Sequence, residues 1–372
     1  MKRLILAAVA VAAATFASAQ GVTDNQIVLG QSVALTGPAQ QLGLDMQLGA
    51  NLYFNRINAQ GGVNGRKIVL KTLDDGYEPP NAVANTKKLI NEEKVFALFG
   101  YVGTPTSNAV LPIFTEARVP FFGPFTGAES LRAPHNRYIF HVRASYFDET
   151  EAIVQHLTAM SVNKIAVFYQ NDGYGQAGLA GVERALKRRN LEVAAKSTVE
   201  RNTVDVKKAV DEMLKAQPQA IVMISAYKSC AAFIKEMKKA NSNPTFWNVS
   251  FVGSKALAKE LDREGRGVQI SQVVPFPWDG TLLVVKEYRR AMEEGKHEPG
   301  FGTLEGWIAA KVMVEGLRRA GRKLDRETFI KAMESINEYD VGGFKVSYGP
   351  TNHAGSKFVD LTIISKDQRF VR

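Results

Sequence analysis

The sequence predicts an α/β protein built as two Rossmann-like lobes, each with a parallel sheet. Short apolar or β-branched runs alternate with stretches that repeat apolar residues at helical spacing, which is typical of βαβ units. The alternation forms two series that meet near residues 144–148. A chain of 372 residues also exceeds the size of one small core. We therefore expect two lobes.

The first 19 residues have the pattern of a secretory signal. A basic pair, Lys2 and Arg3, precedes an apolar run over residues 4–14, and small residues end at Ala19. The apolar run is shorter than the roughly 20 residues that a membrane-spanning helix needs. The residue directly after the cleavage site is Gln20 and not a cysteine that could carry a lipid. We expect cleavage after Ala19 and a soluble mature chain in the periplasm.

The first lobe begins with a β-branched strand over residues 27–33. A long helix follows, because Leu44, Leu48 and Leu52 recur near the helical period, and a glycine pair at 61–62 ends it. A second strand reaches residue 73. The elements expected next are a strand at 95–99, a helix at 107–117, and strands at 119–122 and 139–143.

The second series and the remainder of the chain follow the same alternation. The elements expected in the second series are strands at 164–168, 192–199 and 220–224 and helices at 174–189, 204–216 and 229–240. An extended, proline-containing run at 273–277 follows, and then helices at 282–292, 304–319 and 326–335 and a last strand at 358–364.

The loop of residues 36–39 follows the first strand, at the strand ends where open α/β sheets hold their ligands. Its pattern T-G-P-x-x-x-x-G, with I-N-A-x-G-G-V-N-G-R-K after the helix, resembles the leucine/isoleucine/valine-type periplasmic substrate-binding proteins of ABC importers. The resemblance covers essentially the whole mature chain. It implies the type I periplasmic binding protein fold, whose two lobes are joined by a three-segment hinge.

The resemblance also implies the domain boundaries. We expect the chain to cross between lobes near Ala144, near Pro275 and at 349–355. The expected division is residues 1–19 for the signal peptide, 20–144 and 276–349 for the first lobe, and 145–275 and 350–372 for the second lobe.

One loop of the first lobe places Thr104, Thr106 and Ser107 at the start of a helix. Such hydroxyls serve as ordinary helix caps, but a helix N-terminus also attracts anions. The resemblance implies that this loop binds a ligand carboxylate, with Thr104 as the hydroxyl. It further implies backbone contacts from the next loop, which contains Phe125 and Gly127.

The second lobe contributes Tyr174 and Tyr227, each just beyond a strand end. By pattern alone they also fit half-buried surface aromatics; the resemblance implies that they line the ligand pocket. Ser250 departs from the family, which has an acidic residue there to pair with a ligand ammonium. Leu42 likewise replaces an aromatic residue of the first loop, and Gly103 stands in place of a disulfide cysteine.

We therefore expect a binding protein that closes its lobes on a small carboxylated solute and presents it to the membrane permease of an ABC importer. Amino acids, keto acids and aromatic acids all belong to this class. Because a neutral Ser250 cannot pair with a buried ammonium, we expect keto or aromatic acids to outcompete leucine, isoleucine and valine. Glu305 is the residue that would overturn this expectation if its helix brings it to the cleft.

Two other functions use similar features. Residues 173–178 fit G-x-G-x-x-G, which suggests an exported dinucleotide-dependent oxidoreductase, but Asp172 would repel a pyrophosphate and Tyr174 is bulky for the close turn. A ligand-sensing module for a receptor or signalling partner would share the fold and pocket. We expect no enzyme, because no catalytic motif or metal spacing of histidines is present, and no cofactor or metal.

The net charge is +10, and it becomes +8 when Lys2 and Arg3 leave with the signal. The basic residues are spread along the chain without interleaved aromatics, so we expect no nucleic-acid partner. Cys230 is the only cysteine, so no internal disulfide holds the fold. We expect a monomer.

Overall fold

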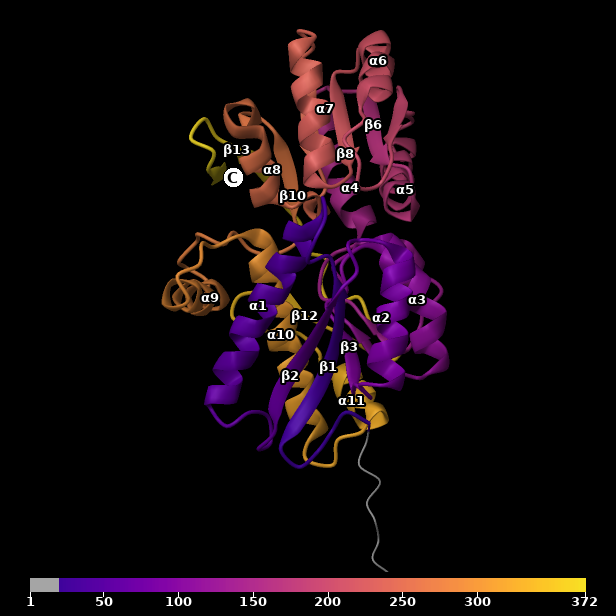
Figure 1. Ribbon diagram of the computed structural model, residues 1–372. Helices are drawn as coiled ribbons and strands as arrows, with labels where there is room; N and C mark the ends of the chain where they lie inside the picture. The colour runs from indigo at the N-terminus through magenta and orange to yellow at the C-terminus, as the bar shows by residue number, and fades with distance from the viewer. Residues whose placement is uncertain (1–19) are drawn as a thin grey trace, which may run out of the picture.

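A computed structural model describes residues 20–372 and shows two lobes, each built around one sheet (Figure 1). The predicted signal at residues 1–19 lies outside the described residues. Within residues 20–372, no helix combines the length and the apolar character needed to cross a membrane. The predicted α/β class with two lobes is confirmed.

The first lobe has a five-stranded parallel sheet in the order β2-β1-β3-β4-β5. Its strands are β1 (Gln26–Val33), β2 (Lys67–Asp74), β3 (Ala97–Phe99), β4 (Phe121–Phe122) and β5 (Ile139–Phe140). Its helices are α1 (Gln40–Ala59), α2 (Pro79–Asn91), α3 (Thr104–Glu116), α9 (Leu283–Glu294), α10 (Phe301–Ala320) and α11 (Arg326–Glu334), with η1 (Glu129–Leu131) and a small β11 (Tyr339–Asp340) and β12 (Lys345–Val346) pair.

The second lobe has a seven-stranded sheet in the order β14-β13-β10-β9-β8-β6-β7. Its strands are β6 (Ile165–Gln170), β7 (Lys196–Val199), β8 (Ala220–Ile224), β9 (Thr245–Asn248), β10 (Gln269–Gln272), β13 (Asp360–Ile364) and β14 (Phe370–Val371). This sheet is mixed, because β13 runs antiparallel to both β10 and β14. Its helices are α4 (Tyr146–Ala159), α5 (Gly173–Lys187), α6 (Lys207–Ala216), α7 (Tyr227–Lys239) and α8 (Ser254–Leu261), with η2 (Ser250–Val252) and η3 (Asp262–Gly265).

The chain passes between the sheets after β5, after β10 and after β12. The residue boundaries of the lobes given above remain a proposal. Several expected elements differ at their ends: the helix expected at 107–117 begins at Thr104, and the strand expected at 192–199 is only β7. Helices α2, α4 and α8 and strands β10, β11, β12 and β14 were not expected at all.

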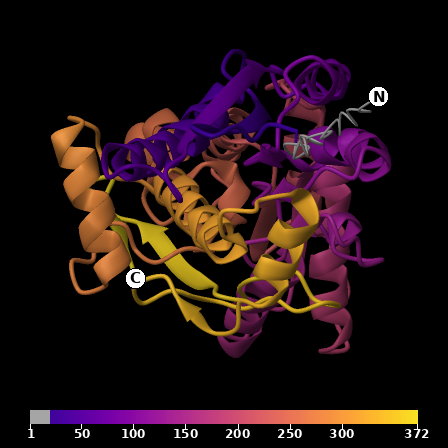
Figure 2. The same ribbon diagram turned by 90° about the horizontal axis from the view of Figure 1, so that it is seen from below.

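Helix α10 lies against α1 along much of its length (Figure 2). Two glycines allow this close approach. A Cβ on Gly49 would overlap the Thr303 carbonyl, and a Cβ on Gly306 would overlap the Met46 carbonyl. The packing fixes the N-terminal half of α10, which includes Glu305, at the end of the first lobe that faces the second.

Candidate functional site

The carboxyl ends of the parallel strands of both lobes face each other, so the loops beyond them meet between the lobes (Figure 1). Direct contacts join these loops. The Gln170 side-chain amide of the second lobe donates to the Tyr77 hydroxyl of the first at 3.2 Å. The Gln41 backbone N–H of the first lobe donates to the Tyr227 hydroxyl of the second at 3.5 Å. The lobes therefore adopt a closed arrangement.

A cluster of aromatic rings fills the centre of this interface. Phe251 from η2 packs against Tyr77 and Phe125 of the first lobe and against Tyr174 of the second, with ring centroids 4.6–5.9 Å apart. Tyr174 also packs against Tyr146 at 5.4 Å. All five side chains are buried. Phe251 was not among the predicted site residues, because nothing in the local pattern distinguishes it from a core residue.

Helix α3 begins at this cluster with Thr104. The Thr104 hydroxyl lies 2.6 Å from the Thr126 hydroxyl, and both residues are buried. Gly103 precedes the helix with φ 105° and provides no side-chain cap, so no side-chain oxygen occupies the N-terminus of α3. This N-terminus therefore keeps the N–H groups and dipole that favour an anion.

Thr106 and Gly127, which were also predicted to lie at the ligand site, make different contacts. Thr106 donates to the backbone carbonyls of Val102 and Gly103 at 2.6 and 3.1 Å, so its hydroxyl is used within its own helix turn. The Gly127 carbonyl accepts from the Tyr146 N–H at 2.7 Å, and a Cβ at Gly127 would approach that nitrogen to 2.6 Å. Gly127 thus brings the first crossing close to the site.

The two predicted tyrosines occupy different parts of the interface. Tyr174 is buried, and its hydroxyl has no hydrogen-bond partner among residues 20–372. Burial raises the pKa of Tyr174 well above its ordinary value, so the hydroxyl stays neutral and can donate. Tyr227 lies instead near Leu42, beside Gly253, with its hydroxyl at the start of α1.

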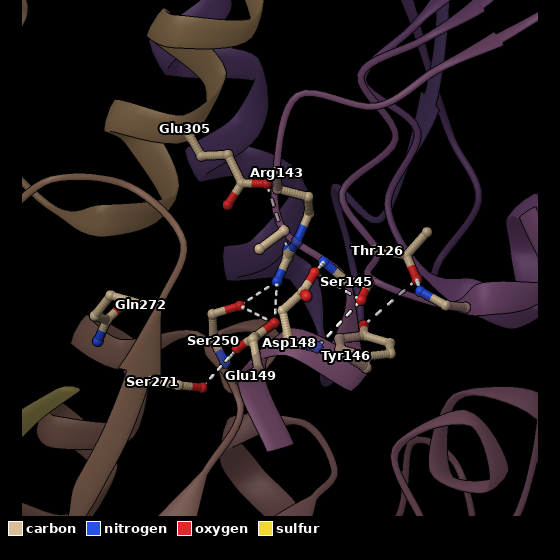
Figure 3. A network of polar contacts seen from close by, with 12 residues as sticks. Thr126, Arg143, Ser145, Tyr146, Asp148, Glu149, Ser250, Ser271, Gln272 and Glu305 are labelled. Carbon is tan, nitrogen blue, oxygen red and sulfur yellow. Dashed lines mark hydrogen bonds and ion pairs between the residues drawn. The ribbon is translucent and has the colours of Figure 1, made fainter. Parts of the chain in front are cut away.

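Ser250 belongs to a buried polar network that joins the lobes (Figure 3). The Glu149 carboxylate accepts from the Ser250 N–H at 2.7 Å, the Ser250 hydroxyl at 3.0 Å, the Ser271 hydroxyl at 2.6 Å and Arg143 Nη2 at 2.9 Å. Arg143 Nη1 donates to Glu305 Oε1 at 3.4 Å. The network combines α4, α10, η2, β10 and the crossing after β5.

This network meets the condition under which the expectation of a keto or aromatic acid was to be given up. Ser250 is neutral, but it holds Glu149, and α10 brings Glu305 to the same place. Burial raises the pKa of Glu305 to about 7; the neighbouring Glu149 carboxylate also raises it, and Arg143 lowers it. Burial alone would lower the pKa of Arg143, but the two carboxylates raise it above its ordinary value, so Arg143 stays charged.

The closed arrangement leaves a small space beside this network. It has a volume of about 10 Å³ and is lined by Leu42, Phe125, Ser250, Gln272 and Glu305 among others. This is room for about one water molecule. A solute therefore enters only when the lobes separate.

The dinucleotide alternative meets a specific obstacle at α5. Asp172 caps this helix, with its carboxylate accepting from the N–H groups of Tyr174 at 2.9 Å and Gly175 at 3.4 Å. A pyrophosphate would need those donors, and they are already bound to an anion. The glycine pattern here belongs to a helix cap.

Comparison with known proteins decides the family. A family model described as "Periplasmic binding protein" matches residues 26–368. This chain belongs to that family. The family consists of binding proteins rather than enzymes, and the type I fold expected from the sequence is confirmed.

Curated relatives match along nearly the whole chain. One is the "Leu/Ile/Val-binding protein homolog 7" of Brucella abortus, which is 24% identical over 92% of this chain and 89% of its own. Another is the "Leucine-, isoleucine-, valine-, threonine-, and alanine-binding protein" of Pseudomonas aeruginosa, which is 23% identical over 88% of this chain and 86% of its own.

Solved structures of similar proteins have the same fold as this chain. A possible leucine/isoleucine/valine-binding protein from Rhodopirellula baltica has a TM-score of 0.90 and 34% identity, covering 94% of this chain and 97% of the other. A branched-chain amino acid ABC transporter protein from Thermus thermophilus with bound valine has a TM-score of 0.85 and 18% identity, covering 94% and 96%. Both structures have the fold of the periplasmic binding protein family to which the chain belongs.

Residues 20–372 contain no group of three or more His, Cys, Asp and Glu side chains placed to bind a metal. Cys230 is buried, its thiol lies 3.4 Å from the Ser225 carbonyl, and burial raises its pKa above the ordinary value.

Proposed function

We propose that this protein is the periplasmic solute-binding component of a branched-chain-amino-acid-type ABC importer, exported by a signal cleaved after Ala19, and that it presents its closed form to the membrane permease. The observation that carries the proposal is the interlobe cluster. Phe125 comes from the first lobe, Tyr174 and Phe251 from the second, and Arg143 from the first crossing. A solute held by such a set contacts both lobes only when they are shut, and so shifts the hinge equilibrium toward closure.

The solute carboxylate is proposed to bind at the N-terminus of α3. Thr104 supplies a buried hydroxyl there, already oriented by Thr126 at 2.6 Å. Tyr174 supplies a second hydroxyl, which has no hydrogen-bond partner within residues 20–372. Hydrogen bonds to a charged group contribute about 1.5–3 kcal/mol each, so these two donors and the helix dipole can retain a carboxylate.

The solute ammonium is proposed to pair with Glu305. Glu149 accepts from Arg143, Ser250 and Ser271, whereas within residues 20–372 Glu305 has a single long contact, with Arg143 at 3.4 Å. An α-amino acid therefore fits the site better than the keto or aromatic acid that Ser250 alone suggests. The names of the relatives, and valine in the Thermus structure, support this choice.

Calorimetry with paired ligands tests the proposal. Leucine and valine are titrated beside their 2-keto acids into the wild type, Glu305→Gln and Glu293→Gln, an exposed control in α9. We expect the amino acids to bind the wild type and the control equally and to bind Glu305→Gln at least about tenfold more weakly, equivalent to ~1.4 kcal/mol. Tighter binding of the keto acids, or equal amino-acid binding by Glu305→Gln, would refute the assignment of Glu305.

A further inference from the structure

A second pocket lies at the hinge, separate from the interlobe cluster, and has a volume of about 260 Å³. We call it the hinge pocket. It is lined by the first crossing and the start of α4, by residues 351–354 and Lys357 between β12 and β13, by the η1 loop of the first lobe and by α5 of the second. The acidic residues, arginines and lysine of its lining are Glu129, Arg132, Asp148, Arg184 and Lys357.

The first crossing separates the hinge pocket from the solute site. The Arg143 side chain belongs to the interlobe network, while the Arg143 carbonyl accepts from Arg132 Nη2 at 3.0 Å. Arg132 in turn lines the hinge pocket. The same backbone segment therefore contacts the solute site on one side and the hinge pocket on the other.

The hinge pocket has an excess of positive charge. Arg132, Arg184 and Lys357 form no ion pair within the described chain. Two acids face them, Glu129 and Asp148, but Asp148 already accepts from the Ser145 N–H at 2.9 Å and hydroxyl at 2.8 Å in the cap of α4. Arg132 Nε–H is buried and has no hydrogen-bond partner in the described residues.

Two of the histidines that line the pocket, His141 and His353, add little charge at neutral pH. Burial lowers the pKa of His141 well below its ordinary value, and Arg132 and His353 nearby lower it further. Burial also lowers the pKa of His353 to about 4, while its hydrogen bond to the Ile139 carbonyl opposes the shift. The proposal therefore rests on the two arginines and the lysine, which are charged at neutral pH.

We propose that the hinge pocket binds a small oxyanion and that this binding favours the closed arrangement of the lobes. Arg132 comes from the first lobe, Arg184 from the second, and Lys357 from the third crossing. Guanidinium groups match oxyanion geometry, and an anion shared by these three cations binds best when they lie together as they do here. By reciprocity, the anion raises the affinity for solute and solute raises the affinity for the anion.

Binding is tested with the mature protein and no solute, so a failure of the proposed function does not affect the result. Phosphate, sulfate and acetate are titrated separately, with chloride at matched ionic strength as the reference, and thermal melting is followed. We expect a saturable rise in Tm with at least one oxyanion, since a ligand that binds only the folded state stabilises it. Comparing the three anions shows whether tetrahedral oxyanions or carboxylates are preferred. No saturable rise with any of them would overturn the proposal.

Paired variants locate the site. Arg184→Gln with Lys357→Gln should weaken oxyanion binding at least tenfold, whereas the control Arg263→Gln with Lys207→Gln, which removes the same charges from exposed positions elsewhere, should bind as the wild type does. Equal weakening of oxyanion binding in both double variants would indicate general attraction by positive charge and would overturn the assignment of the hinge pocket as the binding site. Should the first double unfold, Lys357→Gln alone is measured, with an expected loss of about threefold and the same criterion.

Small-angle scattering tests the link to the hinge. A saturating oxyanion should decrease the radius of gyration of the wild type and of the control double, and should not change that of the Arg184→Gln/Lys357→Gln double. Saturable binding with no change in the radius of gyration of the wild type would overturn the hinge coupling.

Discussion

Replacing Glu305 by Gln should make the protein more stable at alkaline pH and flatten its pH dependence. Glu305 is buried between α10 and the interlobe network, next to Glu149 and Arg143. Burial, the dominant cause, raises its pKa from an ordinary 4.5 to about 7. Glutamine has nearly the same shape and cannot ionise, so it reports the cost of placing the second carboxylate charge there.

The sign and size of the effect follow from linkage. Because the folded protein holds the Glu305 proton to a higher pH than the unfolded chain does, stability falls as pH rises through the window between 4.5 and about 7. A shift of this size corresponds to about 3 kcal/mol above pH 8. At pH 5 the same group contributes less than about 1 kcal/mol. Glu305→Gln should therefore exceed the wild type by about 3 kcal/mol at pH 8 and differ little from it at pH 5.

Urea unfolding at several pH values between 5 and 8.5 measures this difference. Other buried acids also titrate in this range, since burial raises the pKa of Asp45 and that of Asp75 to about 6. Only the difference between variant and wild type is therefore informative, and Glu293→Gln, exposed on α9, serves as the control. Parallel stability curves for wild type and Glu305→Gln would refute the reasoning.

Three further results are expected. Thr104→Ala should weaken solute binding by roughly 1.5–3 kcal/mol in calorimetry, because a hydrogen bond to the solute carboxylate is lost. The melting temperature should change little, and unaltered affinity would exclude the N-terminus of α3 as the carboxylate site. Tyr174→Phe keeps the ring contacts and removes the unpartnered hydroxyl, so affinity should fall without loss of stability, whereas a loss of stability alone would indicate a structural role. Glu78→Ala removes the partly exposed contact with Arg201 across the lobes, 2.8 Å long. It should weaken solute binding by at most about 1 kcal/mol, less so at high salt, and a larger, salt-independent loss would show another role.

Much of the fold could be predicted because the strands and the caps follow local rules. The strand at 220–224 coincides with β8, whose five residues are all buried, and a continuous apolar run is the expected pattern for a central parallel strand. Other elements begin or end a few residues away from the predicted positions. For example, α3 starts at Thr104 because Pro105 is tolerated in a first helical turn.

Helix α4 was missed although its start has a recognisable signal. Ser145 and Asp148 form a capping box, each side chain accepting from the backbone N–H of the other. The segment lies at the first crossing between lobes, where we expected only a connection. Without the helix, Glu149 could not be placed; it lies one turn after the start of α4.

The central network could not be predicted from any local pattern. Glu149 and Ser250 are 101 residues apart, and Arg143 and Glu305 are 162 apart. A charged residue on a helix is normally assigned to the solvent side. Only the topology, which brings α4, α10, η2 and the first crossing together, reveals that these charges face one another.

The cost of burying this network supports a functional role for its position. Removing several charged side chains from water is expensive even when they are paired, and an apolar cluster of equal volume is often as stable. Arg143 and Glu149 are fully buried, and Glu305 carries a raised pKa that reflects an incompletely compensated charge. These groups lie where both lobes and the hinge meet, at the place where a charged solute would need partners. The proposed pairing with a solute ammonium would give the Glu305 carboxylate the partner that the closed protein alone does not supply.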